Sequence, residues 1–117
     1  MSRIIALTAA AIGLSVPVAA LAHHGWSSYD ESKPIVVTGT LLKVSWTNPH
    51  GSAQMQWQGK QWGVVLAPVT RMDSRGLTAA MIDKGQTITL TGYARKDGTA
   101  EMRIERVKVG DKTVELR

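Results

Sequence analysis

The chain has 117 residues, with 14 basic and nine acidic side chains, four tryptophans, no phenylalanine and no cysteine. This length suits one small domain with a modest core. The missing cysteines exclude disulfides, thiol redox chemistry and thiolate-bound metals. The positive charge is mild and spread along the chain, so it does not indicate nucleic-acid binding.

Residues 1–22 have the three parts of a secretory signal peptide. Arg3 precedes an uncharged apolar stretch over 4–14, and Ala20-Leu21-Ala22 fits the small-x-small cleavage pattern. The stretch is too short and broken for a convincing membrane span. We therefore expect export to the periplasm and a mature chain that begins at His23 with a free α-amine. Cleavage after Ala20 and an uncleaved anchor are the alternatives.

The mature chain begins with a polar, irregular segment over 23–33, and a long strand follows. Apolar side chains alternate up to Leu41, and the alternation then restarts at Leu42. Such a one-residue shift predicts a β-bulge or a sharp bend. Asn48-Pro49-His50-Gly51 has the composition of a turn that ends the strand.

Two further strands, over 53–58 and 61–66, flank Gly59-Lys60 and predict a hairpin. Thr70 and Asp73 resemble a capping box that opens a short helix, and Thr78 begins a second helical turn that stops at Gly85. Alternating residues then predict strands near 87–93, 102–107 and 113–116.

This order predicts an all-β domain with one short helix, a small OB-like barrel of five or six strands, because the helix falls between the third and fourth strands. A small β-sandwich is the alternative. The domain boundaries are then 1–22 for the signal peptide, 23–33 for the N-terminal segment and 34–117 for the barrel. The alternation predicts a buried core and a set of exposed outer positions. The core comprises Val44, Trp57, Val64, Leu66, Ile88, Leu90 and Ile104, and the exposed set is Gln54, Gln56, Thr89 and Glu105.

Several motifs resemble a group of exported bacterial proteins whose shared domain has no known function. The motifs are HHGWSSYD, TGTLLKVSWTNPHG, WGVVLAP, RGL, GQTITLTGYARKDG and MRIERV. They give a mature His-His-x-Trp start and a Trp-x-Asn-Pro-His turn, and the resemblance covers nearly all of 23–117. It implies an exported, barrel-like single domain and carries no established activity. The later half is also similar, more weakly, to periplasmic bacterial OB-fold proteins linked to envelope stress.

The three histidines, His23, His24 and His50, are the candidate metal ligands. A histidine at the first position offers its α-amine and its ring Nδ1 to one metal ion, and the amine loses its proton at modest cost. A third nitrogen from His24 or His50 would complete a planar set. Tetragonal nitrogen ligation favours copper(II), with zinc as the alternative metal. These histidines could instead lie in a disordered tail and cap a turn.

Other clusters are better explained by packing or solvation. Met55 and Met102, with Met72 and Met81, could form a soft copper(I) set, but strand alternation places the first two in the core. Three tryptophans could form a stacking platform, and a basic face could form on the later strands. These sets are Trp46, Trp57 and Trp62, and Arg71, Arg75, Arg95, Lys96, Arg103 and Arg106.

No nucleophile motif or phosphate-binding loop occurs, so we do not expect an enzyme. The first hypothesis is a periplasmic copper-binding protein that acts as carrier, buffer or sensor. The alternative is a non-metal OB-like module that binds a small ligand, an envelope glycan or a protein partner. A copper enzyme with a histidine brace is the least favoured hypothesis.

Overall fold

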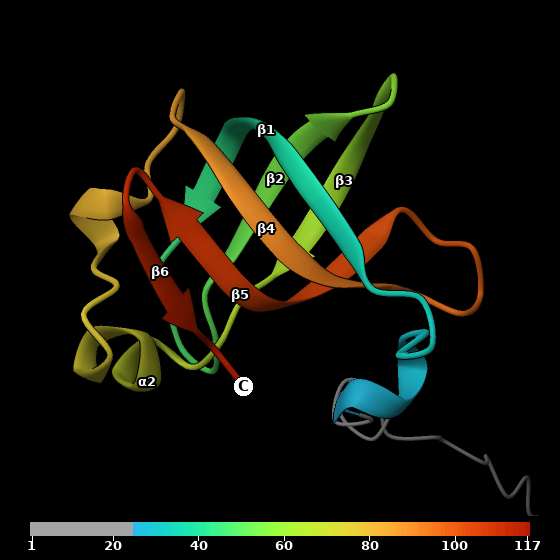
Figure 1. Cartoon of the computed structure of the whole chain (residues 1–117), viewed down its shortest axis with the longest axis horizontal. Helices are drawn as coiled ribbons and strands as arrows, with labels where there is room; N and C mark the ends of the chain where they lie inside the picture. Colours follow the sequence, from blue (N-terminus) through green and yellow to red (C-terminus); the bar gives the residue numbers. More distant parts are fainter. Residues whose placement is uncertain (1–24) are drawn as a thin grey trace, which may run out of the picture.

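The computed structural model describes residues 25–117, and most of them lie in six β-strands (Figure 1). The elements in chain order are η1 (Gly25–Ser28), β1 (Ile35–Ser45), β2 (Ser52–Trp57), β3 (Lys60–Val65), α2 (Val69–Ser74), η2 (Ala79–Met81), β4 (Thr87–Ala94), β5 (Glu101–Val109) and β6 (Lys112–Glu115).

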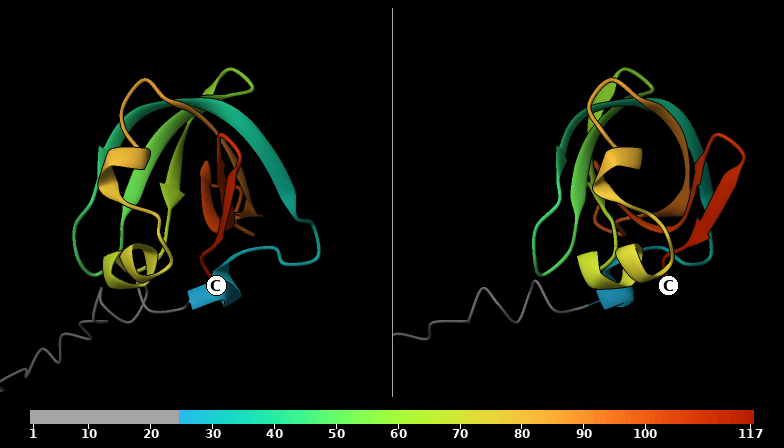
Figure 2. Two further views of the ribbon diagram at one scale, coloured as in Figure 1. Left: turned by 60° about the vertical axis from the view of Figure 1, so that its left-hand side comes forward. Right: turned by 90° about the vertical axis from the view of Figure 1, so that its left-hand side faces the viewer.

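The strands form one sheet in the order β3-β2-β1-β4-β5-β6, and a parallel pairing of β3 with β5 closes the first five strands into a barrel. Strand β6 continues the sheet beyond β5. The two turned views in Figure 2 show the closed ring of strands, with α2 and η2 in the connection between β3 and β4. The predicted OB-like barrel is confirmed, and the closure excludes the β-sandwich alternative.

Strand β1 bends sharply because it takes part in both halves of the barrel. Its pairing with β2 shifts register between Leu41 and Lys43. Leu41 is buried, whereas Leu42 at the shift is 39% exposed, so the break in alternation marks a real bulge. The hairpin of β2 and β3 is also confirmed. Its turn lies one residue earlier than the predicted Gly59-Lys60: Gln58 and Gly59 have φ angles of 50° and 73°, the left-handed pair of a type I′ turn, and Lys60 begins β3.

The barrel interior holds most of the predicted core. Five of the seven predicted residues are at most 2% exposed: Val64, Leu66, Ile88, Leu90 and Ile104. The prediction was wrong in degree for Val44 and Trp57, which are half-buried and pack against the margin of the core. Each lies near an end of its strand, where the neighbouring strands cover one side less completely.

Gln56 is exposed as predicted, but three other outer positions are half-buried. Gln54 accepts a hydrogen bond from Gln61, Thr89 pairs with Thr38, and Glu105 accepts one from Tyr93. Contacts across neighbouring strands therefore cover side chains that alternation alone would leave in water.

The capping box predicted at Thr70 and Asp73 does not form. Pro68 is the N-cap of α2 and no side chain caps the helix, because Thr70 already lies inside its first turn. The helix is held by burial of Met72 and by contacts to the end of the chain. Arg71 donates a hydrogen bond to the carbonyl of Leu116, and Arg75 donates to the carbonyl of Glu115. These contacts occupy backbone acceptors beside the edge strand β6.

Candidate functional site

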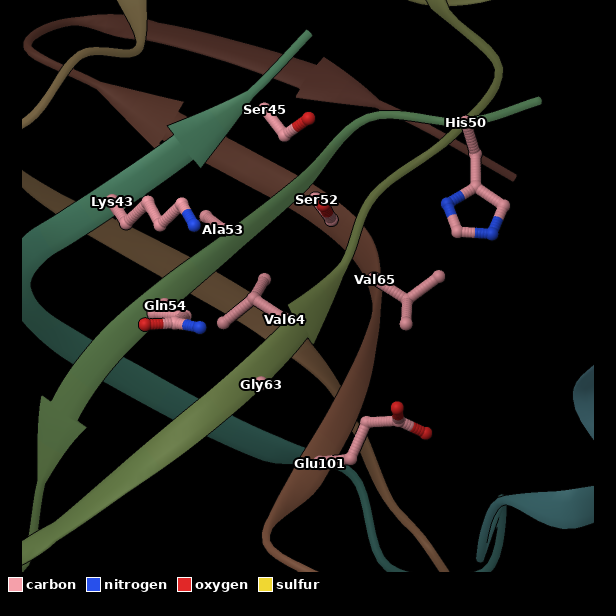
Figure 3. A pocket seen from close by; sticks show the side chains of 10 residues that line it. All are labelled: Lys43, Ser45, His50, Ser52, Ala53, Gln54, Gly63, Val64, Val65 and Glu101. Atoms are coloured by element: carbon pink, nitrogen blue, oxygen red, sulfur yellow. The ribbon is translucent and has the colours of Figure 1, made fainter. Parts of the chain in front are cut away.

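A groove on the outside of the barrel contains His50. This residue follows a cis peptide bond between Asn48 and Pro49, is half-buried, and places its ring Nδ1 3.3 Å from the carbonyl oxygen of Gly51. The groove has a volume of about 480 Å³ and opens over β1, β2, β3 and the start of β5 (Figure 3). Its lining residues are Lys43, Ser45, His50, Ser52, Ala53, Gln54, Gly63, Val64, Val65 and Glu101.

Strand pairing arranges the groove in two rows that cross the strands. One row runs from Lys43 through Gln54 and Gly63 to Glu101, because these residues are partners in successive strand pairs. The second row runs from Ser45 through Ser52 and Val65 to Arg103. Since alternate residues of a strand face the same side, the floor of the groove ends at the outward-facing residues of β5. Gly63 has no side chain, which keeps this floor open.

The segment over 25–30, called here the N-terminal clasp, is bound to the end of β4, to the residues that follow it and to side chains of β5. The amide of Asp30 donates to the carbonyl of Ala94 at 2.8 Å, and the amide of Lys96 donates to the carbonyl of Ser28 at 3.0 Å. Tyr29 forms an isolated bridge with Arg95 and is itself buried. The chain immediately after His24 is therefore held against the barrel by backbone hydrogen bonds.

Trp26 fixes the clasp through its ring. It meets Tyr93 edge-on, with ring centroids 5.9 Å apart. The guanidinium carbons of Arg103 and Arg117 lie 4.5 and 4.3 Å from the centroid of the Trp26 ring. Both distances are within the range of cation–π attraction.

Tyr29 joins the clasp to the groove. Its hydroxyl donates a 2.9 Å hydrogen bond to Oε2 of Glu101, which also accepts from Arg95 at 3.2 Å. Burial, followed by this hydrogen bond, raises the pKa of Tyr29 to about 12. Glu101 lines the same groove as His50, so one carboxylate connects the N-terminal clasp to the groove wall.

The predicted metal ligands fall into two parts of the chain. His23 and His24 lie outside the described residues. His50 lies in the groove, and within 25–117 no three histidine, aspartate or glutamate side chains gather closely enough to hold a metal ion. Figures 1 and 2 place η1 and the loop between β1 and β2, which carries His50, at the same end of the barrel.

The competing clusters pack as expected for structural residues. Met55, Met72 and Met102 are fully buried in the core, and Met81 is half-buried. Trp57 and Trp62 pair across the hairpin with ring centroids 5.3 Å apart, and together with Trp46 they pack against the core. In the predicted basic face, Arg95 pairs with Asp97 and Arg106 pairs with Glu115, whereas Arg71 and Arg75 donate to backbone carbonyls near the end of the chain.

Sequence reasoning missed the N-terminal clasp and the role of Glu101. The available signal was the pair of aromatic residues, Trp26 and Tyr29, in an otherwise polar segment. Large aromatic side chains in a short polar stretch commonly find a surface to cover. Their partners Arg103 and Glu101 lie more than 70 residues further along the chain, so no local pattern could identify them.

Comparison with known protein families identifies the family to which the chain belongs. A model described as a family of unknown function, DUF6152, matches residues 12–103. A search of curated proteins found no match. In the described part of the chain, no helix is long and apolar enough to span a membrane. The chain therefore belongs to the DUF6152 family, in agreement with its resemblance to a family of unknown function.

Proposed function

We propose that this protein is a periplasmic copper-binding protein, a carrier, buffer or sensor, that holds one copper(II) ion between its mature amino terminus and His50. Cleavage after Ala22 would make His23 the first residue. Its α-amine and ring would then chelate the ion, and His50 would supply a further nitrogen from the barrel. Zinc is the alternative metal, since imidazole suits both ions.

The observation that carries this proposal is the anchoring of the clasp beside the His50 groove. Gly25 directly follows His24, and a Cβ atom at Gly25 would lie 4.0 Å from Nη1 of Arg103. Arg103 pairs with Val65, which lines the groove. Each residue of extended chain spans about 3.5 Å, so two further residues and a histidine side chain give the terminus a reach of more than about 10 Å along this wall.

The proposed ligand set explains why the site would need both parts of the chain. Two nitrogens from one residue give a weak chelate, whereas a third ligand on a rigid barrel adds affinity at little entropic cost. Glu101 is engaged by Tyr29 and Arg95, so the proposal does not use it as a ligand. Protons compete for the same nitrogens, so the copper affinity should fall as the pH is lowered.

A copper(II) titration of the exported, processed protein tests the contribution of His50. We expect binding of one ion per chain, with the affinity reduced about tenfold or more in His50→Ala. The matched control is Asn48→Ala, which changes an exposed residue of the same turn and should leave the affinity unchanged. Equal affinities in wild type and His50→Ala would remove the barrel ligand and contradict the proposal.

A second candidate function rests on the position of the groove. It lies over β2 and β3 beside the β1–β2 loop, the face on which OB-folds commonly bind oligonucleotides and oligosaccharides. Its lining mixes apolar residues with Lys43, Ser52 and Gln54, which offer hydrogen bonds. A non-metal module of this kind would bind a small ligand, an envelope glycan or a protein partner. Binding of soluble envelope glycan fragments to chelator-treated protein would favour it over the copper proposal.

A further inference from the structure

Arg103 lacks an acidic partner. All nine acidic residues of the chain lie within 25–117, and residues 1–24 contain neither aspartate nor glutamate. The carboxylates that form ion pairs with arginine do so with arginines other than Arg103. Arg95 pairs with Asp97 and Glu101, Arg106 pairs with Glu115, and Arg117 pairs with Glu31 and Glu105.

The Arg103 guanidinium is also partly withdrawn from water. Its Nε atom is buried and has no hydrogen-bond partner among the described residues. Burial, together with the positive charges of Arg117 and Arg71, lowers the pKa of Arg103. A half-buried cation that faces other cations is costly unless an anion completes its surroundings.

The surroundings of Arg103 hold an aromatic ring and a second cation. Its guanidinium stacks on Trp26, and stacking on an aromatic face leaves the N–H groups at the edge of the guanidinium plane available as donors. The guanidinium of Arg117 also contacts the Trp26 ring, so two guanidinium groups lie beside one indole. Arg103 is also the strand partner of Val65, so it lies on β5 next to a residue that lines the groove.

We propose that Arg103, with Arg117 and the ring of Trp26, forms a binding site for an oxyanion, the phosphate or carboxylate group of a small ligand. The fork of N–H donors on Arg103 matches the paired oxygens of either group. Arg117 contributes charge while its own carboxylate partners hold it in place. The site is distinct from the proposed copper ligands and requires no metal.

Calorimetric titration of the whole processed protein tests the site, with a chelator present and the ionic strength held constant by chloride. The probes are inorganic phosphate and acetate, which separate a tetrahedral oxyanion from a planar carboxylate. We expect saturable binding of at least one probe, and we expect Arg103→Gln to weaken it about tenfold or more. The matched control is Arg106→Gln on the same strand, whose side chain pairs with Glu115 and should not contribute.

Wild-type protein that binds neither probe up to about 10 mM would overturn the inference, because such an affinity is weaker than a built site provides. Equal weakening in Arg103→Gln and Arg106→Gln would also overturn it, since the effect would then reflect net charge alone. Arg103→Lys is the control for a folding defect. It keeps the positive charge but lacks the paired N–H donors of the guanidinium, so it should retain part of the oxyanion affinity. Copper(II) titration of Arg103→Gln separates the two proposals, since loss of oxyanion binding with unchanged copper affinity leaves both intact.

Discussion

Trp26 is the residue on which the N-terminal clasp depends most. Its ring contacts Tyr93, Arg103 and Arg117, which belong to two strands and the end of the chain. A large aromatic ring contributes apolar area at a low entropic cost, and the two guanidinium groups add cation–π attraction. One side chain thereby fixes the position of the clasp on the barrel.

Tyr29 gives the clasp a pH dependence that can be measured. Its pKa of about 12 lies above the ordinary value of 10.0 because the buried neutral phenol donates to Glu101. The neutral form is therefore favoured by folding, so its stabilising contribution is complete below pH 10 and is lost as the pH rises through about 12. We expect Tyr29→Phe to lower the free energy of unfolding at neutral pH by about 1 kcal/mol.

Phenolate absorbance during an alkaline titration checks this expectation. Hydrogen bonding to Glu105 also raises the pKa of Tyr93, so neither tyrosine of wild-type protein should ionise at the ordinary pH. A tyrosine that titrates near pH 10 in wild type and disappears in Tyr29→Phe would contradict the contact with Glu101.

At the scale of strands, the β4–β5 pair shows why Arg103 lies where it does. The register of this pair shifts between Thr91 and Gly92. A Cβ atom at Gly92 would collide with the backbone carbonyl of Arg103, so only glycine permits this close approach. The close approach fixes the β5 backbone at Arg103, whose guanidinium carbon lies 4.5 Å from the centroid of the Trp26 ring.

Gly92→Ala should therefore damage the fold more than an ordinary glycine substitution. We expect the free energy of unfolding to fall by about 2 kcal/mol or more, because rigid backbone atoms cannot move away from the new methyl group. Gly63→Ala is the matched control, since a Cβ there would sit in ordinary contact, 3.7 Å from its nearest neighbour. Chemical denaturation of both variants is the measurement, and equal losses of stability would contradict the close approach at Gly92.

The same comparison of strands shows what the sequence could predict. Alternation and turn residues predicted the hairpin, the bulge in β1 and the place of the helix, because these features depend on neighbours in the chain. The failures concern where elements begin and how completely their ends are covered. Thr70 did not cap α2, since Pro68 already begins it, and Val44 and Trp57 are less buried than predicted because they lie at the margin of the core. For the site, the position of His50 in a turn was predictable, whereas its groove was not.

For the whole molecule, the closed barrel gathers distant parts of the chain at one end. The β1–β2 loop with His50, the N-terminal clasp and helix α2 all lie there (Figures 1 and 2). Strand closure through β3 and β5 brings Glu101 beside the groove, and Tyr29 then connects this wall to the residues that follow His24. One end of the barrel therefore holds the elements on which the copper proposal depends within the described residues.

The most direct test of the copper proposal compares the processed chain with one that carries a single extra glycine before His23. The extra residue replaces the amine of His23 with an amide, a much poorer ligand, while all three histidine rings and the barrel stay unchanged. We predict that copper(II) binds the processed chain with one-to-one stoichiometry. We expect its affinity for the extended chain to be lower by about tenfold or more. Equal affinities in this titration would show that the terminal amine is not a ligand and would contradict the proposed site.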